Sequence, residues 1–258
     1  MNEKKYKYIY GPIPSWRLGN SLGIDPLSVV DKTCTFDCIY CQIGKTKDFS
    51  SERKVFIPTE EIIREIKTLP QVKIDYITFS GTGEPTLAKN LGHMIREVKK
   101  IRPERIAVLT NSSLLAREDV RQDILPADLV AVKLDADSQR IFELVNRPQE
   151  EIKFDITLQA IKDFRKIYTG KLALQVMFTE ENKECASQIA QIAREINPDE
   201  VQINTPLRPC PAKPLSRQEI DEIKEFFYGL NVVSVYEAEK KEVKPISDED
   251  TLRRRGKV

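Results

Sequence analysis

The chain has 258 residues, of which 40% are hydrophobic and 31% are charged, and its formal net charge is +1. This length suits one or two domains, and a single α/β barrel of this size is common. The small net charge excludes the overall basic excess of a general nucleic-acid-binding protein, although local basic patches remain compatible with it.

The first ten residues, MNEKKYKYIY, contain no apolar run of the kind that a signal peptide carries. No stretch approaches the ~20 apolar residues that span a bilayer. We therefore expect a soluble, cytoplasmic protein that does not associate with membranes. In the cytoplasm, five cysteines are more typical of metal or redox chemistry than of disulfides.

Strands and helices are predicted to alternate along the chain. Alternating or continuous apolar residues predict strands near 21–30, 73–80, 105–109, 128–134, 171–178, 200–204 and 231–236. Helical spacing of apolar residues predicts helices over 59–69 (with Thr59 as N-cap), 91–101, 154–167, 185–196 and 220–227. This alternation indicates βαβ units and a parallel sheet. We expect an N-terminal extension at 1–20, the α/β domain at 21–242 and a basic C-terminal tail at 243–258.

Ligands of parallel α/β folds bind at the carboxyl ends of the strands. Five polar stretches follow predicted strands: SGTGEPT (80–86), TNSS (110–113), LDAD (134–137), MFTE (177–180) and INTPLRP (203–209). We expect these stretches to share one rim and to bind a polar ligand there.

Three cysteines lie close together in the segment TCTFDCIYCQIG, at Cys34, Cys38 and Cys41, with the spacing C-x3-C-x2-C. Three thiolates can belong to a zinc site or to an iron–sulfur cluster. Structural zinc needs four ligands, and the fourth would have to come from far along the chain. Cys185 is expected on the apolar face of its helix, whereas Cys210 is expected on a rim loop.

A [4Fe–4S] cluster is ordinarily held by four cysteine thiolates. Three cysteines leave one iron open, and an open iron can take a substrate or a cofactor. The cluster hypothesis therefore predicts a catalytic site, and the zinc hypothesis predicts a closed structural one.

The cysteine spacing, with an aromatic residue (Tyr40) before the last cysteine, resembles the signature of the radical SAM superfamily. In that family the open iron binds S-adenosylmethionine (SAM), and the reduced cluster cleaves it to a 5′-deoxyadenosyl radical that abstracts hydrogen from a substrate. The resemblance runs over roughly residues 22–208 and includes SGTGEPT, TNSS, LDA and QINTP. It implies a partial (β/α)6 TIM-like barrel, with the cluster on a loop at 31–50 after the first strand.

The same resemblance implies the site residues. Cys34, Cys38 and Cys41 would bind the cluster. The cofactor-binding residues implied for SAM are Tyr40, Ile43, Gly81, Gly83, Glu84, Asn111, Ser112, Asp135 and Asn204. The insertion of Thr82 departs from the family's glycine-rich motif, so that Gly83 and Glu84 match it better than Gly81.

A narrower resemblance lies in YGPIPSWRLGNSLGID near the N-terminus and in VNRP at 145–148. Both are similar to a subgroup of Fe–S oxidoreductases that is distantly related to the wyosine tRNA-modifying enzymes. Those enzymes carry additional N-terminal cysteines, and this chain has none before Cys34, which argues against the same reaction.

The resemblance also implies an electron donor, such as flavodoxin or ferredoxin. The substrate stays open: it could be an RNA or tRNA base, or a small molecule. Alternatively, the protein could be a maturase or activase that modifies a protein partner, or a non-catalytic electron-transfer protein.

Four residues are candidates for catalysis or substrate contact: Lys133, Asp135, Arg208 and Cys210. Lys133 and Asp135 could form a structural ion pair, or either could contact SAM or substrate. The basic segment 253–257 is expected to be a solvated end or a binding site for RNA phosphates or an acidic partner.

Overall fold

The computed structural model of the chain describes residues 6–237 and 243–255. One eight-stranded sheet, with the order β1-β2-β5-β6-β7-β8-β9-β10, forms its centre. These strands are β1 (Ile9–Ser15), β2 (Gly19–Ile24), β5 (Tyr76–Phe79), β6 (Arg105–Thr110), β7 (Leu129–Lys133), β8 (Lys171–Met177), β9 (Glu200–Asn204) and β10 (Val232–Ser234). Every neighbouring pair is parallel except β1 and β2.

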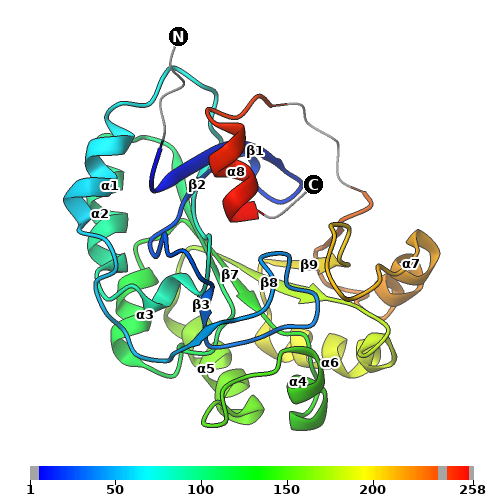
Figure 1. The fold of residues 1–258 in the computed structure, drawn as a ribbon. Coiled ribbons are helices and arrows are strands. Elements are labelled where there is room, and N and C mark those ends of the chain that lie inside the picture. Colours follow the sequence, from blue (N-terminus) through cyan, green and yellow to red (C-terminus); the bar gives the residue numbers. More distant parts are fainter. Residues whose placement is uncertain (1–5, 238–242, 256–258) are drawn as a thin grey trace.

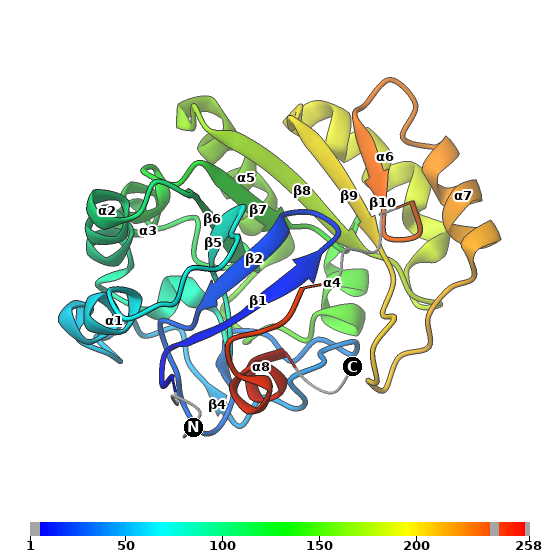
Figure 2. The same ribbon diagram turned by 90° about the horizontal axis from the view of Figure 1, so that it is seen from above.

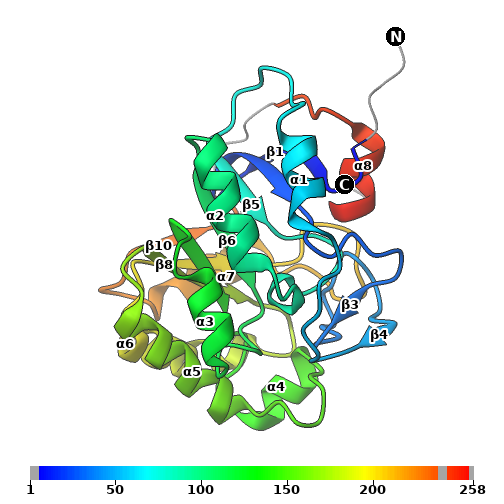
Figure 3. The same cartoon turned by 90° about the vertical axis from the view of Figure 1, so that its left-hand side faces the viewer.

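The helices cover the outer face of this curled sheet (Figure 1). They are α1 (Thr59–Ile66), α2 (Leu91–Ile101), α3 (Glu118–Ile124), α4 (Gln139–Val145), α5 (Phe154–Ile167), α6 (Ala186–Ile196) and α7 (Arg217–Glu225), with 3-10 turns η1 (Pro85–Leu87) and η2 (Lys183–Cys185). The last helix, α8 (Asp248–Arg255), lies at the edge of the sheet (Figure 2). Figure 3 shows α1, α2 and α3 following one another along the outer side. The predicted partial TIM-like barrel is confirmed.

Successive side chains of a strand point to opposite faces of the sheet, so the buried apolar residues form two layers. Ile106, Val108, Val130 and Val132 belong to the main core under the helices. Their strand neighbours form a smaller cluster on the concave face, which contains Leu18, Ala107, Leu129, Ala131 and Ala173. Two residues beyond Ala131 and Ala173, the paired residues Lys133 and Gln175 continue the same face of β7 and β8 with polar side chains.

The first parallel strand is shorter than predicted and has an unpredicted neighbour. β2 ends at Ile24 because the Asp25 carboxylate accepts hydrogen bonds from the N–H groups of Leu27 (3.2 Å) and Ser28 (3.0 Å), which turns the chain. β1 pairs with β2 in an antiparallel hairpin at the edge of the sheet. Part of the segment expected as an N-terminal extension thus extends the sheet.

The C-terminal segment lies beside that edge. Figure 2 shows α8 next to β1. The Gly11 N–H donates to the Thr251 hydroxyl (3.1 Å), and the Ile246 N–H donates to the Gly11 carbonyl (2.6 Å). The expectation of a solvated basic end is wrong for Arg254, which is buried; residues 256 and 257 of that segment lie outside the described residues.

Helix starts differ from the prediction at three places, and one of them is α7, which begins at Arg217 and not at residue 220. Thr59 is the first residue of α1 and not its N-cap, which is Pro58. Cys185 precedes α6 as its N-cap and is half-buried, so it packs against the core from the helix end. None of the helices in the described ranges is long and apolar enough to cross a membrane.

Candidate functional site

The three clustered cysteines lie on the loop that follows β2. Cys34 ends the short strand β3 (Thr33–Cys34), which pairs with β4 (Asp48–Phe49). Cys34 is buried, whereas Cys38 and Cys41 are half-buried. The loop is anchored to α4, because Phe36 packs edge-to-face on Phe142 with the ring centroids 5.2 Å apart. This anchoring fixes the cysteines at the rim of the barrel.

Burial controls the protonation of the thiols. Burial raises the pKa of Cys34 to about 12, and Lys32 opposes this shift. Burial and the neighbouring Cys41 raise the pKa of Cys38 to about 11. Burial lowers the pKa of Lys32, but negative charge on Cys41 and Cys34 outweighs this effect, so that its pKa is raised. The Cys34 and Cys38 thiols therefore hold their protons more tightly than ordinary thiols do, and metal binding must release these protons.

The three cysteine thiols suit a cluster of several irons better than a site for a single metal ion. Among residues 6–237 and 243–255, no three Cys, His, Asp or Glu side chains form a group that could hold one metal ion. In a [4Fe–4S] cluster each thiolate binds a different iron, so the thiolates need not converge on one point. Cys38 and Cys41 lie on one turn of the loop, because the Cys41 N–H donates to the Cys38 carbonyl (3.1 Å).

The glycine-rich stretch after β5 runs against the cysteine loop. The Glu84 N–H donates to the Thr33 carbonyl (3.3 Å), and Thr33 and Gly83 form a parallel bridge. A Cβ at Gly83 would overlap the Thr33 carbonyl oxygen, so only glycine fits this close approach. Gly81, with φ +156°, packs in the same way against the Asp25 carboxyl group.

Glu84 ties this stretch to the next strand end. Its carboxylate accepts hydrogen bonds from the Thr86 N–H (3.1 Å) and hydroxyl (2.7 Å), the Thr110 hydroxyl (2.7 Å) and the Asn111 N–H (2.7 Å). Burial raises the pKa of Glu84, and these hydrogen bonds oppose the shift. Both carboxylate oxygens thus organise the rim; direct contact between Glu84 and SAM stays a prediction.

Asn111 and Ser112 follow β6 at the same rim. The Asn111 amide donates to the Thr35 hydroxyl (2.8 Å) and lies 3.5 Å from the Cys34 sulfur. Ser112, with φ +73°, bonds its hydroxyl to the backbone of Lys133 on β7 (2.9 and 3.1 Å). Asn111 therefore lies at the cysteine cluster, whereas the Ser112 hydroxyl joins two strands.

A buried polar group centres on Asp135. Its carboxylate accepts hydrogen bonds from the Tyr40 hydroxyl, the Asn146 amide (2.7 Å) and the Met177 N–H (2.7 Å). Burial and the Asp135 charge raise the pKa of Tyr40 well above its usual range, which keeps the phenol a donor. The Asn146 amide also lies 3.6 Å from the Cys38 sulfur, so this group reaches the cysteine cluster.

Lys133 stands beside the Asp135 group. Its ammonium nitrogen lies 3.6 Å from Asp135 and 4.9 Å from the centre of the Tyr40 ring. Within the described part of the chain it has no hydrogen-bond partner, although it is buried. The ion pair expected between Lys133 and Asp135 is present, and a donor remains available for a ligand.

The other predicted residues lie at the periphery of the cluster. Arg208 donates to Gln42 of the cysteine loop (2.6 Å), and the Cys210 thiol donates to the Ala212 carbonyl (3.3 Å). Burial raises the pKa of Cys210, and Cys41 adds to this shift. Ile43 is half-buried on the same loop. Asn204 accepts the Thr205 N–H (2.9 Å) at the end of β9.

A pocket of about 230 Å³ adjoins Cys38 and Cys41, with Lys45, Arg147 and Pro211 in its wall. A larger hollow of about 410 Å³ lies between Leu69 and Arg102. It contains none of the predicted site residues, so we assign the function to the cysteine rim.

Sequence reasoning did not give roles to Asn146 and Lys32. Asn146 belongs to the VNRP motif, which was noted only as a resemblance, and its contacts with Cys38, Tyr40 and Asp135 depend on α4 folding back on the cysteine loop. Lys32 lies two residues before Cys34 and donates to the Gly44 carbonyl (3.1 Å). Its position so close to the cysteine motif is the sequence signal from which a role for Lys32 could have been predicted.

Comparisons with known proteins agree with this geometry. Residues 29–193 match the family model described as the Radical SAM superfamily. A UPF0026 protein of Synechocystis sp. is 41% identical over 211 residues, which cover 81% of this chain and 78% of that protein. A UPF0026 protein of Methanocaldococcus jannaschii is 39% identical over 233 residues, covering 87% and 71%. The structure of TYW1 with a lysine-pyruvate adduct bound shares the fold, with a TM-score of 0.62 at 15% identity, covering 81% of this chain and 74% of that one.

Proposed function

Because the chain belongs to the radical SAM superfamily, we propose that Cys34, Cys38 and Cys41 hold a [4Fe–4S] cluster and that the enzyme cleaves SAM reductively. When bound, this pair of cofactors supplies a 5′-deoxyadenosyl radical that abstracts hydrogen from a substrate. The contacts of Asn111 carry the proposal: its amide lies 3.5 Å from the Cys34 sulfur, and its N–H donates to Glu84. The cysteine loop, the glycine-rich stretch and TNSS thus meet at one point.

The protein's own groups have distinct tasks in this proposal. Gly83 leaves its backbone close to the cysteine loop for the ammonium group of SAM, and Asn111 supplies a polar amide beside it. Lys32 places a positive charge next to the thiolates. The Asp135 group fixes Tyr40 at the rim, where its ring can flank the adenine.

Substrate would bind on the concave face below the cluster. Lys133, Gln175 and Gln202 are direct neighbours in the register of β7, β8 and β9, so their side chains form one row. The Lys133 ammonium and the Gln202 carbonyl oxygen are buried and, in the described ranges, without hydrogen-bond partners. Buried polar groups of this kind favour a polar substrate, such as a nucleobase or a polar small molecule. Asp135, Arg208 and Cys210 are the other candidate contacts with substrate, and Asn204 is a candidate contact with SAM.

The experiment is anaerobic reconstitution with iron and sulfide, reduction with dithionite and addition of SAM. We expect 5′-deoxyadenosine by mass spectrometry and none from Cys38→Ala. Cys185→Ala removes a thiol that precedes α6, outside the cysteine loop, and should retain both iron and product. Product formation by Cys38→Ala at the normal rate would refute the proposal.

Two additions to this assay address partner and substrate. Reduced flavodoxin or ferredoxin should replace dithionite as electron donor. RNA, a dialysable small-molecule fraction and a protein fraction are then compared for acceleration of 5′-deoxyadenosine formation. Acceleration by the protein fraction alone would favour a maturase over the enzyme acting on a base or small molecule.

A further inference from the structure

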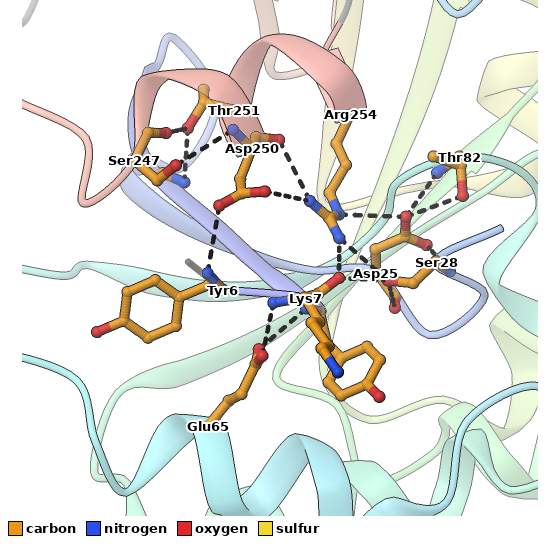
Figure 4. Close-up of polar contacts among 12 residues, drawn as sticks. Tyr6, Lys7, Asp25, Ser28, Glu65, Thr82, Ser247, Asp250, Thr251 and Arg254 are labelled. Carbon is orange, nitrogen blue, oxygen red and sulfur yellow. Dashed lines mark hydrogen bonds and ion pairs between the residues drawn. The ribbon is translucent and has the colours of Figure 1, made fainter. Parts of the chain in front are cut away.

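Arg254, in the last turn of α8, has a buried charged side chain (Figure 4). Its guanidinium lies 3.4 Å from the Asp25 carboxylate, and both side chains are 1% exposed. It also contacts the Asp250 carboxylate (3.6 Å) and donates to the Lys7 carbonyl. The nearest approach to Asp25 is an ion pair and not a hydrogen bond, because the Nε–H is not directed at the carboxylate.

Asp25 connects this guanidinium to the glycine-rich stretch. Its Oδ2 atom, the one nearest Arg254, accepts hydrogen bonds from the N–H (3.2 Å) and the hydroxyl (2.9 Å) of Thr82. Thr82 stands between Gly81 and Gly83, and Gly81 packs directly against the same carboxyl group. Figure 4 shows this continuous path from α8 through Asp25 to Thr82.

Covering the sheet edge does not require this arginine. α8 is already docked on β1 by the hydrogen bonds of Gly11 with Thr251 and Ile246. A buried ion pair is in general no more stabilising than apolar residues of similar size. The position of the guanidinium is therefore better explained by the hydrogen bonds between Asp25 and Thr82 than by the docking of α8.

We propose that Arg254 is a positioning residue for SAM: through Asp25 it fixes Thr82, and with it the backbone of Gly81 and Gly83 that receives the SAM ammonium group. The inference rests on the proposed function. It makes the docking of α8 and the binding of SAM two coupled equilibria, so each must strengthen the other by the same factor.

The test measures SAM affinity by equilibrium dialysis on the reconstituted protein, at matched iron content, for three variants. Arg254→Gln should weaken SAM binding by about tenfold. Arg254→Lys keeps a cation opposite Asp25 and should recover most of the loss. Thr251→Val, in the same helix, removes the hydrogen bond from Gly11 and should lower the melting temperature. It should leave SAM affinity within about twofold of wild type, because the Ile246 bond still holds α8 on β1 and Arg254 stays opposite Asp25.

A second measurement does not depend on the variants folding. In the wild-type holoprotein, SAM should slow amide hydrogen exchange in α8, because the coupling is reciprocal. Unchanged exchange in α8, or equal SAM affinity of wild type and Arg254→Gln, overturns the role of Arg254 while the proposed function stands. Absence of SAM binding by the wild type refutes the proposed function and this inference together.

Discussion

Gly83 shows how a single residue sets the distance between two parts of the site. Its backbone touches the Thr33 carbonyl, one residue before Cys34, and any side chain would overlap that oxygen. The atom in conflict belongs to the backbone, so it cannot rotate away. The closeness of the cysteine loop and the glycine-rich stretch thus depends on the lack of a Cβ at this position.

We expect Gly83→Ala to lower 5′-deoxyadenosine formation by at least about tenfold, because the added methyl group must push the two segments apart. Gly229→Ala is the matched control. Gly229 has φ +80° and open space around its Cα, so the substitution should cost about 1 kcal/mol of stability without affecting the site. Normal activity of Gly83→Ala would mean that the contact with Thr33 is not needed.

The sequence motifs predicted which residues lie at the rim better than they predicted which residues contact one another there. Cys34, Gly83 and Asn111 were predicted from local patterns, and the structure brings them together. The bond between Asn146 and Asp135, or between Thr82 and Asp25, joins residues whose proximity is decided by the packing of whole elements. No local pattern encodes such a pair.

Among the elements, α7 has the most complete helix start. The Ser216 hydroxyl accepts the Glu219 N–H (3.2 Å), and the Glu219 carboxylate accepts the Ser216 N–H (2.8 Å), which forms a capping box. The bonds from Ser216, together with Lys183, lower the pKa of Glu219 to about 2. The start of α7 is therefore held by side-chain bonds and by an ion pair to η2.

Replacing Ser216 by alanine should lower the free energy of unfolding by about 1 kcal/mol, because the first turn of α7 loses its hydroxyl acceptor. Urea denaturation of the metal-free protein measures this change. Ser216→Thr keeps the acceptor and should behave almost like the wild type. An equal loss for both variants would contradict the capping explanation.

Strongly periodic elements were predicted correctly, and short or polar ones were not. The long apolar patterns of α2 and α5 and the buried strands β7 and β8 each identify their own type. The helices α3 and α4 have only seven residues each, which is too short for a clear helical period of apolar residues. α8 is rich in charged residues, so its sequence shows no clear apolar pattern either. β1 depends on pairing with β2, which its sequence does not specify.

At the scale of the whole molecule, buried thiols link stability to pH. The ordinary thiol pKa is 9.0, and the folded values are about 12 for Cys34 and about 11 for Cys38. Between these values the unfolded chain loses protons that the folded chain retains. The raised values therefore stabilise the fold below about pH 9, and this contribution is lost as the pH rises further.

We expect the melting temperature of the metal-free protein to fall as the pH rises from about 9 to about 12. The fully buried thiol of Cys34 alone should account for about 1.4 kcal/mol per pH unit above its unfolded pKa. Thermal melts of wild type and Cys34→Ala check this, and the variant should show the shallower decline. Parallel curves for the two proteins would show that Cys34 is not the group responsible.

The contact between Arg254 and Asp25 has a consequence for biosynthesis. A ribosome completes β2, the cysteine loop and the glycine-rich stretch long before it reaches α8, so the nascent barrel contains the Asp25 carboxylate without its cation. The backbone that we propose to receive SAM would lack this support until α8 has been synthesised. We therefore expect that iron can be loaded before α8 is made, whereas full affinity for SAM requires α8.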